Sequence, residues 1–225
     1  MEKNLKPLIS ILVPVHNTQK YLEACLTSIK NQTYNNLEII CIDDCSTDSS
    51  YEILKEYERK DNRIKVIHKA NAGVGEARNS GLDVATGDYI GFVDSDDFID
   101  ENFYEKMLNS IIENNADLCM CGYKYIYDNG EKIYIEKNLP NVNSKTIFKY
   151  FFETNIVKSK NAIVSDGIAG FVVRLLVKSS LVKNIRFKKF VIAEDLLFLL
   201  TLIKDDVKIC VVNENLYNYY IRPRI

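Results

Sequence analysis

The sequence predicts an α/β fold, in which helices flank a mostly parallel, Rossmann-like sheet that is joined by a smaller mixed or antiparallel lobe. Short β-branched runs alternate with helix-spaced runs four times in about the first hundred residues, the pattern of a parallel sheet with right-handed crossovers. The second half instead carries a hairpin signal. Hydrophobic residues make up 47% of the 225 residues, which is enough for a substantial core.

The predicted strands of the first half are short runs rich in apolar and β-branched residues. They cover residues 8–15, 37–42, 64–67 and 89–93. Runs that are apolar almost throughout fit strands buried on both faces of a parallel sheet. Between them, helical spacing is clearest in the set Leu22, Cys25, Leu26 and Ile29. Residues 46–49 offer N-cap side chains to a second helix, and residues 71–73 turn the chain into a third, which carries Arg78.

The second half begins with a helix marked by Phe103, Met107, Ile111 and Ile112. Residues 117–127 and 132–136 then flank the turn Asp128-Asn129-Gly130, which predicts a hairpin. Residues 196–203 are apolar almost all round and predict a buried helix directly after Glu194-Asp195. Because no linker or repeat interrupts the chain, we expect a single domain of residues 1–225 with two functional halves, about 1–97 and about 98–225.

Composition excludes several classes of function. The net charge of -2 comes from 29 basic and 31 acidic residues spread along the chain, which argues against nucleic-acid binding. No segment approaches the roughly 20 apolar residues of a membrane helix, and no signal peptide is readable, so a cytoplasmic protein is expected. Six cysteines without a C-x-x-C pair favour reduced core thiols over disulfides or zinc ligands.

Polar residues follow three of the predicted strands. The first strand ends in Pro14-Val15-His16-Asn17, the second in Asp43-Asp44 and the fourth in residues 94–97. Ligands of open α/β sheets bind outside the carboxyl ends of the strands, so these side chains are candidates for a binding site.

The three carboxylates within residues 94–97 repel one another unless a cation or hydrogen-bond donors compensate them. A divalent cation such as Mg²⁺ or Mn²⁺ is the simplest compensation, and a turn that caps the helix beginning near Asp100 is the alternative. Asp44 likewise fits either a nucleoside contact or a helix start. Arg78 fits a diphosphate contact or an ion pair with Glu76 or Asp83.

Together, these segments resemble the family 2 glycosyltransferases, which have the nucleotide-sugar-binding fold called GT-A. The resemblance covers almost the whole chain, and its specificity comes from the order and spacing of many short matches. These matches are ISILVPVHN (9–17), YL (21–22), CL (25–26), SI (28–29), QT (32–33), EII (38–40), DD (43–44), NAG (71–73), ARN (77–79), GL (81–82), GDYI (87–90) and DSDD (94–97).

The resemblance implies a role for each site residue. The nucleotide is expected to contain uridine or a related nucleoside. The residues implied to bind it are Pro14, Val15, His16, Asn17, Asp44, Asn71, Arg78, Asp94 and Ser95. Asp94 and Asp96 form a D-x-D element that serves ribose and a divalent metal, Mn²⁺ or Mg²⁺, with Asp96 the direct ligand. Asp97 is expected to contact the acceptor or the donor sugar. Glu194-Asp195 matches a late acidic pair, with Asp195 as general base, although the residues alone favour a helix cap there.

The implied activity is inverting transfer of a sugar from a nucleoside diphosphate donor, a UDP-sugar, to a hydroxyl group of a glycan or lipid-linked saccharide in cell-surface polysaccharide synthesis. His16 stands where the family more often has Tyr. Relatives also continue beyond residues 219–225, so a further tail with acceptor-binding residues and peripheral contact with the inner membrane face is expected. The alternatives are an inactive nucleotide-binding module and a sugar nucleotidyltransferase, although residues 14–18 lack the Gly-rich basic loop of the latter.

Overall fold

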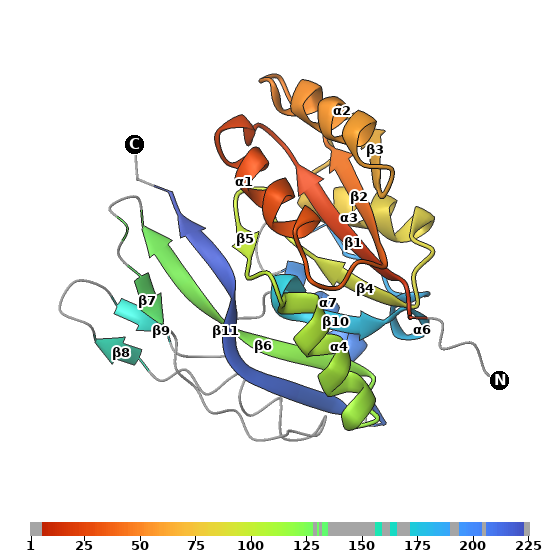
Figure 1. Cartoon of the computed structure of the whole chain (residues 1–225), viewed down its shortest axis with the longest axis vertical. Helices are drawn as coiled ribbons and strands as arrows, with labels where there is room; N and C mark the ends of the chain where they lie inside the picture. Colours follow the sequence, from red (N-terminus) through yellow and green to blue (C-terminus); the bar gives the residue numbers. More distant parts are fainter. Residues whose placement is uncertain are drawn as a thin grey trace.

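The computed structural model describes residues 6–127, 130, 132–134, 156–158, 163–165, 172–189, 194–203 and 206–222. Its first half contains the predicted parallel strands, in the spatial order β3-β2-β1-β4 (Figure 1). Their bounds are β1 Ile9–Val15, β2 Leu37–Asp43, β3 Ile64–His68 and β4 Tyr89–Phe92. Strand β1 lies at the centre, with Ile9 opposite Leu37 on one side and Tyr89 on the other. The parallel sheet of the first half is therefore confirmed.

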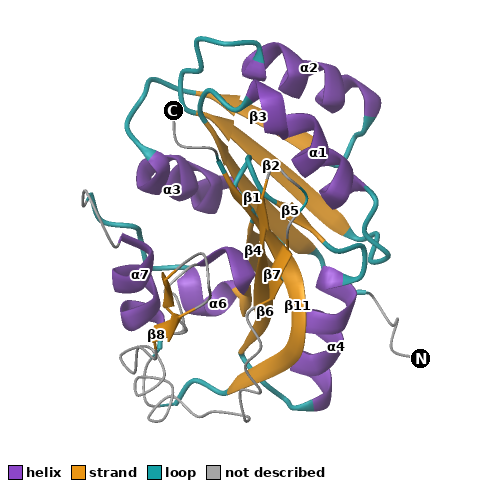
Figure 2. Ribbon diagram, turned by 90° about the vertical axis from the view of Figure 1, so that its left-hand side faces the viewer, coloured by secondary structure: helices purple, strands orange, loops and turns teal. Residues whose placement is uncertain are grey.

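Helices cover both faces of the sheet. Figure 2 shows α1, α2 and α4 on one face and α3, α6 and α7 on the other. Their bounds are α1 Gln19–Lys30, α2 Ser50–Lys60, α3 Val74–Val84, α4 Phe103–Glu113, α6 Ser179–Val182 and α7 Glu194–Leu202. The side chains predicted for the inner face of α1, from Leu22 to Ile29, are all buried. The predicted buried helix is present as α7, and it begins at Glu194, two residues before the predicted start at 196.

The sheet continues without a break from β4 into the second half. Strand β10 (Leu175–Lys178) runs antiparallel to both β4 and β6 (Leu118–Tyr127), and β11 (Ile209–Ile221) runs parallel to β6. The short β5 (Phe98–Ile99) pairs with the far side of β11. The mixed part is thus an extension of the parallel sheet, and it curls along the bent β11 (Figure 1).

Smaller elements complete the second half. Strand β7 (Lys132–Tyr134) pairs antiparallel with β6, which confirms the predicted hairpin. At its turn, Gly130 has φ +79°, a conformation that favours glycine, while Asp128 and Asn129 lie outside the described residues. Strands β8 (Ile156–Lys158) and β9 (Ile163–Ser165) form a separate pair, and the 3₁₀ helix η1 (Val172–Arg174) leads directly into β10.

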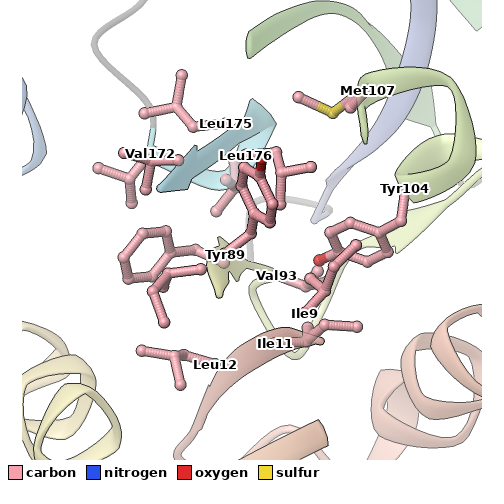
Figure 3. Packing of buried hydrophobic residues seen from close by; sticks show 14 of the residues in the cluster. Ile9, Ile11, Leu12, Tyr89, Val93, Tyr104, Met107, Val172, Leu175 and Leu176 are labelled. Carbon is pink, nitrogen blue, oxygen red and sulfur yellow. The ribbon is translucent and has the colours of Figure 1, made fainter. Parts of the chain in front are cut away.

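One hydrophobic core joins the two halves. In Figure 3, Tyr89 of β4 lies between Leu12 of β1 and the pair Leu175 and Leu176 of β10, and all four side chains are buried. Five cysteines are buried and none is in a disulfide, as predicted, whereas Cys45 is exposed. None of the helices that the structure describes has the length and apolar character needed to cross a bilayer.

Candidate functional site

A cavity of about 360 Å³ opens at the carboxyl ends of the parallel strands. Its lining includes predicted residues from the ends of β1, β2 and β4 and from the loop after β3: Pro14, Val15, His16, Asp44, Asn71, Asp94, Ser95 and Asp96. The remaining lining residues are Thr18, Gly73, Val74, Ala77 and Arg222. Most of the predicted binding residues therefore line one cavity, at the carboxyl ends of the strands as expected for an open α/β sheet.

Pro14 marks where the sheet opens into this cavity. Strand β4 pairs with β1 only as far as Leu12, whose carbonyl accepts the backbone N–H of Val93. In a parallel strand, alternate residues bond to the same neighbour, so the Pro14 nitrogen faces the side that β4 has already left. A proline, which has no N–H to donate, is tolerated there without loss of a ladder bond.

Asp44 holds the loop that closes one side of the cavity. Its carboxylate accepts the backbone N–H groups of Ala72 (3.0 Å) and Gly73 (2.8 Å) and the ammonium group of Lys69 (3.0 Å). Burial acts to raise the pKa of Asp44, but these donors stabilise its charged form and lower the pKa overall. Asp44 is therefore a fixed carboxylate at the cavity wall.

His16 is held in a defined tautomer. Its Nδ1 lies 2.9 Å from the carbonyl oxygen of Asp44, which can only accept, so Nδ1 carries the proton. Nε2 is then the acceptor for the Asn17 side-chain amide at 3.3 Å. Asn17 has φ +53° and its Oδ1 accepts the N–H of Thr47 at 2.8 Å. Asn17 thus joins the loops after β1 and β2, and the His16 ring remains on the cavity wall.

The acidic cluster after β4 is compensated residue by residue. Asp94 accepts a hydrogen bond from Arg78 at 2.8 Å, and Asp96 pairs with Arg222 at the end of β11. Burial, followed by the charges of Asp94 and Asp96, raises the pKa of Asp97 to about 9. The two guanidinium groups offset the repulsion that the sequence predicts at Asp94 and Asp96.

Asp97, which is expected to contact a sugar, is not among the residues that line the cavity. Its carboxyl group accepts the phenol O–H of Tyr217 at 2.6 Å and the backbone N–H of Tyr220 at 2.8 Å, and the residue is only 2% exposed. Successive side chains in the turn after β4 point to different sides, so Asp97 faces β11 while Asp96 faces the cavity. Its role is to attach the acidic turn to β11.

Arg78 links the cavity to the expected catalytic pair. Its guanidinium group is 2% exposed and donates to Asp94 at 2.8 Å and to Asp195 at 2.5 Å. Neither alternative partner of Arg78 is used, and Asp83 pairs instead with Arg186. Burial raises the pKa of Asp195 to about 6 against the opposing charge of Arg78. Asp195 also accepts the backbone N–H of Val172 at 3.3 Å, while Glu194 precedes it in the first turn of α7.

Asp94 and Asp96 fit a divalent cation that is shared with a substrate. Mg²⁺ and Mn²⁺ prefer oxygen ligands and commonly take one or two carboxylates together with substrate phosphates. Within the described ranges, the side chains of His, Cys, Asp and Glu form no group of three or more that is placed to hold a metal. The two carboxylates on the cavity wall could therefore supply only part of a coordination shell, which phosphate oxygens and water would have to complete.

Several residues that line the cavity or contact its wall were not singled out from the sequence. Thr18 donates its hydroxyl to Ser95 at 3.0 Å and so connects the start of α1 to the acidic turn. Lys69 follows β3 directly, and the strand-end rule would have found it if it had been applied to that strand. Arg222 had no local signal, since only the path of β11 brings it to Asp96.

The fold is shared with a solved structure. TarS residues 1–349 from S. aureus, in complex with UDP-GlcNAc, superimpose with a TM-score of 0.74 and 28% identity. The match covers 97% of this chain and 60% of that one. The α/β architecture described above is therefore the GT-A architecture.

Sequence relatives agree with this match. Glycosyltransferase GlyA from Streptococcus pneumoniae is 37% identical over 95% of this chain, which spans 30% of GlyA. The uncharacterized glycosyltransferase EpsJ from Bacillus subtilis is 31% identical over 96% of this chain, which spans 62% of EpsJ. The family described as glycosyl transferase family 2 matches residues 10–178, more than half of the chain. The chain thus belongs to glycosyl transferase family 2.

Proposed function

We propose that this chain is the catalytic part of an inverting glycosyltransferase, which transfers a sugar from a nucleoside diphosphate to a hydroxyl group of a glycan or lipid-linked saccharide. One observation carries the proposal: Arg78 joins Asp94 on the cavity side to Asp195 at the start of α7. A transferase needs a donor site and a base for the acceptor next to each other, and this ion-pair network supplies that proximity. UDP is the expected nucleotide, supported by the likeness to TarS with UDP-GlcNAc.

On this proposal, residues 1–97 bind the nucleotide and residues 98–225 bind the acceptor. The backbone from Pro14 to Asn17 and the carboxylate of Asp44 would contact the nucleoside, with Asn71 and Ser95 beside it. Asp94 and Asp96 would hold Mn²⁺ or Mg²⁺, which when bound neutralises charge on the leaving diphosphate. Contact with the cytoplasmic face of a membrane, through a lipid-linked acceptor, belongs to the same proposal.

Asp195 would take the proton of the attacking hydroxyl group. Its pKa of about 6 leaves it mostly ionised at neutral pH while keeping it more basic than an ordinary carboxylate. The charge of Arg78 favours the ionised form, and the N–H of Val172 fixes the second carboxylate oxygen. Attack from the face of the sugar opposite the diphosphate gives inversion at the anomeric carbon.

A screen of nucleotide sugars for slow donor hydrolysis tests this proposal. The full chain is incubated with each donor and MnCl₂, and release of the nucleoside diphosphate is measured, with Asp195→Asn as the matched control. We expect release from one UDP-sugar, reduced in the variant. Pyrophosphate formed from UTP and a sugar 1-phosphate would instead indicate a nucleotidyltransferase. Calorimetric binding of UDP without hydrolysis of any donor or transfer to any acceptor would indicate an inactive module.

A further inference from the structure

Arg174, at the end of η1, is a buried cation without a counter-ion among the described residues. The residue is 3% exposed, and its Nε and Nη2 atoms have no hydrogen-bond partner among the residues that the structure describes. Nη1 makes one long bond of 3.5 Å to the carbonyl of Cys121, and the guanidinium carbon lies 5.4 Å from the centre of the Tyr123 ring. By contrast, four other arginines each pair with an aspartate: Arg63, Arg78, Arg186 and Arg222.

The two unpartnered atoms of Arg174 form one edge of the guanidinium plane. Nε–H and an Nη2–H point in nearly parallel directions, which is the fork that matches two oxygen atoms of a phosphate or a carboxylate. A buried charge without a partner is unfavourable, because it has lost its water and gained nothing in exchange. Burial accordingly lowers the pKa of Arg174. An oxyanion from a ligand would satisfy both donors.

Arg174 is close along the chain to a residue that contacts the proposed base. It directly precedes β10, in which Leu176 is opposite Gly91 of β4 and Leu175 is opposite Met120 of β6. Val172, two residues earlier, donates its backbone N–H to Asp195. The segment that positions Arg174 therefore also contacts the proposed base. The rings of Tyr123, Tyr125 and Tyr219 continue from there in successive edge-to-face contacts.

We propose that Arg174 binds an oxyanion carried by the acceptor, so that the enzyme glycosylates an acidic acceptor that bears a phosphate or a carboxylate near the reacting hydroxyl group. This inference rests on the proposed function. The donor diphosphate is assigned to the cavity at Asp94 and Asp96, whose lining does not include Arg174. An anionic group bound at Arg174 would therefore belong to the acceptor.

Thermal unfolding of the full chain with small acidic probes tests the inference. The probes are glycerol 3-phosphate and glucuronate, with glycerol and glucose as neutral controls, all with saturating UDP and Mg²⁺ so that the donor site is filled. We expect at least one acidic probe to raise Tm by roughly 5–10 °C at a hundredfold excess over its Kd. Which probe acts distinguishes a phosphate-bearing acceptor from a carboxylate-bearing one.

Substitutions assign the response to Arg174. Arg174→Met should abolish the Tm rise and, without a probe, should unfold at the same temperature as wild type or higher, because it removes an uncompensated buried charge. Arg174→Lys keeps the charge but lacks the two parallel N–H donors, so it should bind the acidic probe at least tenfold more weakly. Arg186→Met removes an exposed arginine and should respond as wild type does.

Three outcomes would overturn the inference: no acidic probe raises Tm of the wild type, Arg174→Met retains the response, or Arg174→Lys responds as strongly as wild type. A wild type that ignores the probes while Arg174→Met fails to fold would make Arg174 a structural residue, which also overturns it. Calorimetric titration of UDP into the same proteins reads the donor site by itself. UDP binding without a probe response contradicts only this inference, whereas loss of UDP binding contradicts the proposed function.

Discussion

The two sides of the cavity hold their charged groups in different ways. On the β1–β3 side, Asp44 is fixed by backbone N–H groups of a loop 28 and 29 residues away and by Lys69. On the β4–β10 side, carboxylates are held by guanidinium groups of distant segments, with Arg78 117 residues from Asp195 and Arg222 126 residues from Asp96. Backbone bonds are part of the fold, whereas ion pairs can be exchanged for a bound phosphate or cation. We therefore expect a preformed nucleoside side and an exchangeable diphosphate side.

Replacement of the proposed base gives the largest expected effect on the exchangeable side. Asp195→Asn should lower transfer by about 10² to 10⁴-fold, because the amide cannot accept the acceptor's proton, while binding of UDP stays near wild type. Rates are measured with the donor found in the hydrolysis screen, and affinity is measured by calorimetry. Glu194→Gln is the matched control in the same turn and should have a smaller effect. Near-normal turnover of Asp195→Asn would remove the base from the mechanism.

Loss of the Arg78 guanidinium group, which Asp94 and Asp195 share, should lower the stability of the fold. Arg78→Met keeps the bulk of the side chain but leaves Asp94 and Asp195 without their partner, which we expect to reduce the free energy of unfolding by about 3 kcal/mol. This is the low end for a buried ion pair, because the Asp94 side chain is 29% exposed. Urea denaturation measures the change.

The control for Arg78 is the exposed pair between Arg186 and Asp83. Both side chains of that pair are more than a third exposed, so Arg186→Met should change stability by only about 0–1 kcal/mol. Equal losses in the two variants would mean that Arg78 is no more important to the fold than a surface residue.

The pH dependence of Asp195 sharpens the comparison further. Its pKa of about 6 predicts that turnover rises with pH through 6 and is about tenfold lower for each unit below it. Folding raises this pKa above that of the unfolded chain, so the stability that Asp195 contributes is present at low pH and is lost as pH rises through 6. Activity and stability should thus change in opposite directions. Asp195→Asn should remove this dependence of stability on pH. A wild-type rate that is flat between pH 5 and 7 would contradict the assignment of Asp195 as the base.

The smallest expected effect concerns Arg222. Its guanidinium group pairs with Asp96 and also lies 5.5 Å from the ring of Tyr21, so a cation at Asp96 must displace it. Arg222→Ala should therefore bind Mn²⁺ several-fold more tightly in the absence of nucleotide. The measurement is the paramagnetic broadening of water protons during a Mn²⁺ titration. Weaker binding by the variant would show instead that Arg222 helps to assemble the metal site.

Sequence patterns predicted the first half of the fold well because its elements are locally encoded. Each strand there is an apolar run and each helix has a buried stripe, so only element ends moved by a residue or two. Strand β10 was missed because it has four residues and is followed directly by a short helix. Strand β11 was missed because polar residues, Asn213 to Asn215, interrupt its middle.

The residues of the site also divide into those that sequence patterns predicted and those that depend on tertiary packing. Asp44, Asp94 and Asp96 follow strands, so a rule about strand ends located them without a structure. The partners of Arg78 and Arg222 depend on how distant segments cross, which no local pattern encodes. Asp97 belongs to the same acidic run, and its burial against Tyr217 depends on the path of β11. Residue type therefore located the site, whereas tertiary packing decided which carboxylates face it.

A crystal of the full chain soaked with UDP and MnCl₂ tests most directly whether strand-end carboxylates form a nucleotide and metal site. The predicted result is an anomalous peak for manganese at Asp96, with Arg222 displaced from it and uracil beside Asp44 in an unchanged loop. An empty cavity at saturating ligand, or manganese bound elsewhere, would contradict both the site and the proposed transfer reaction.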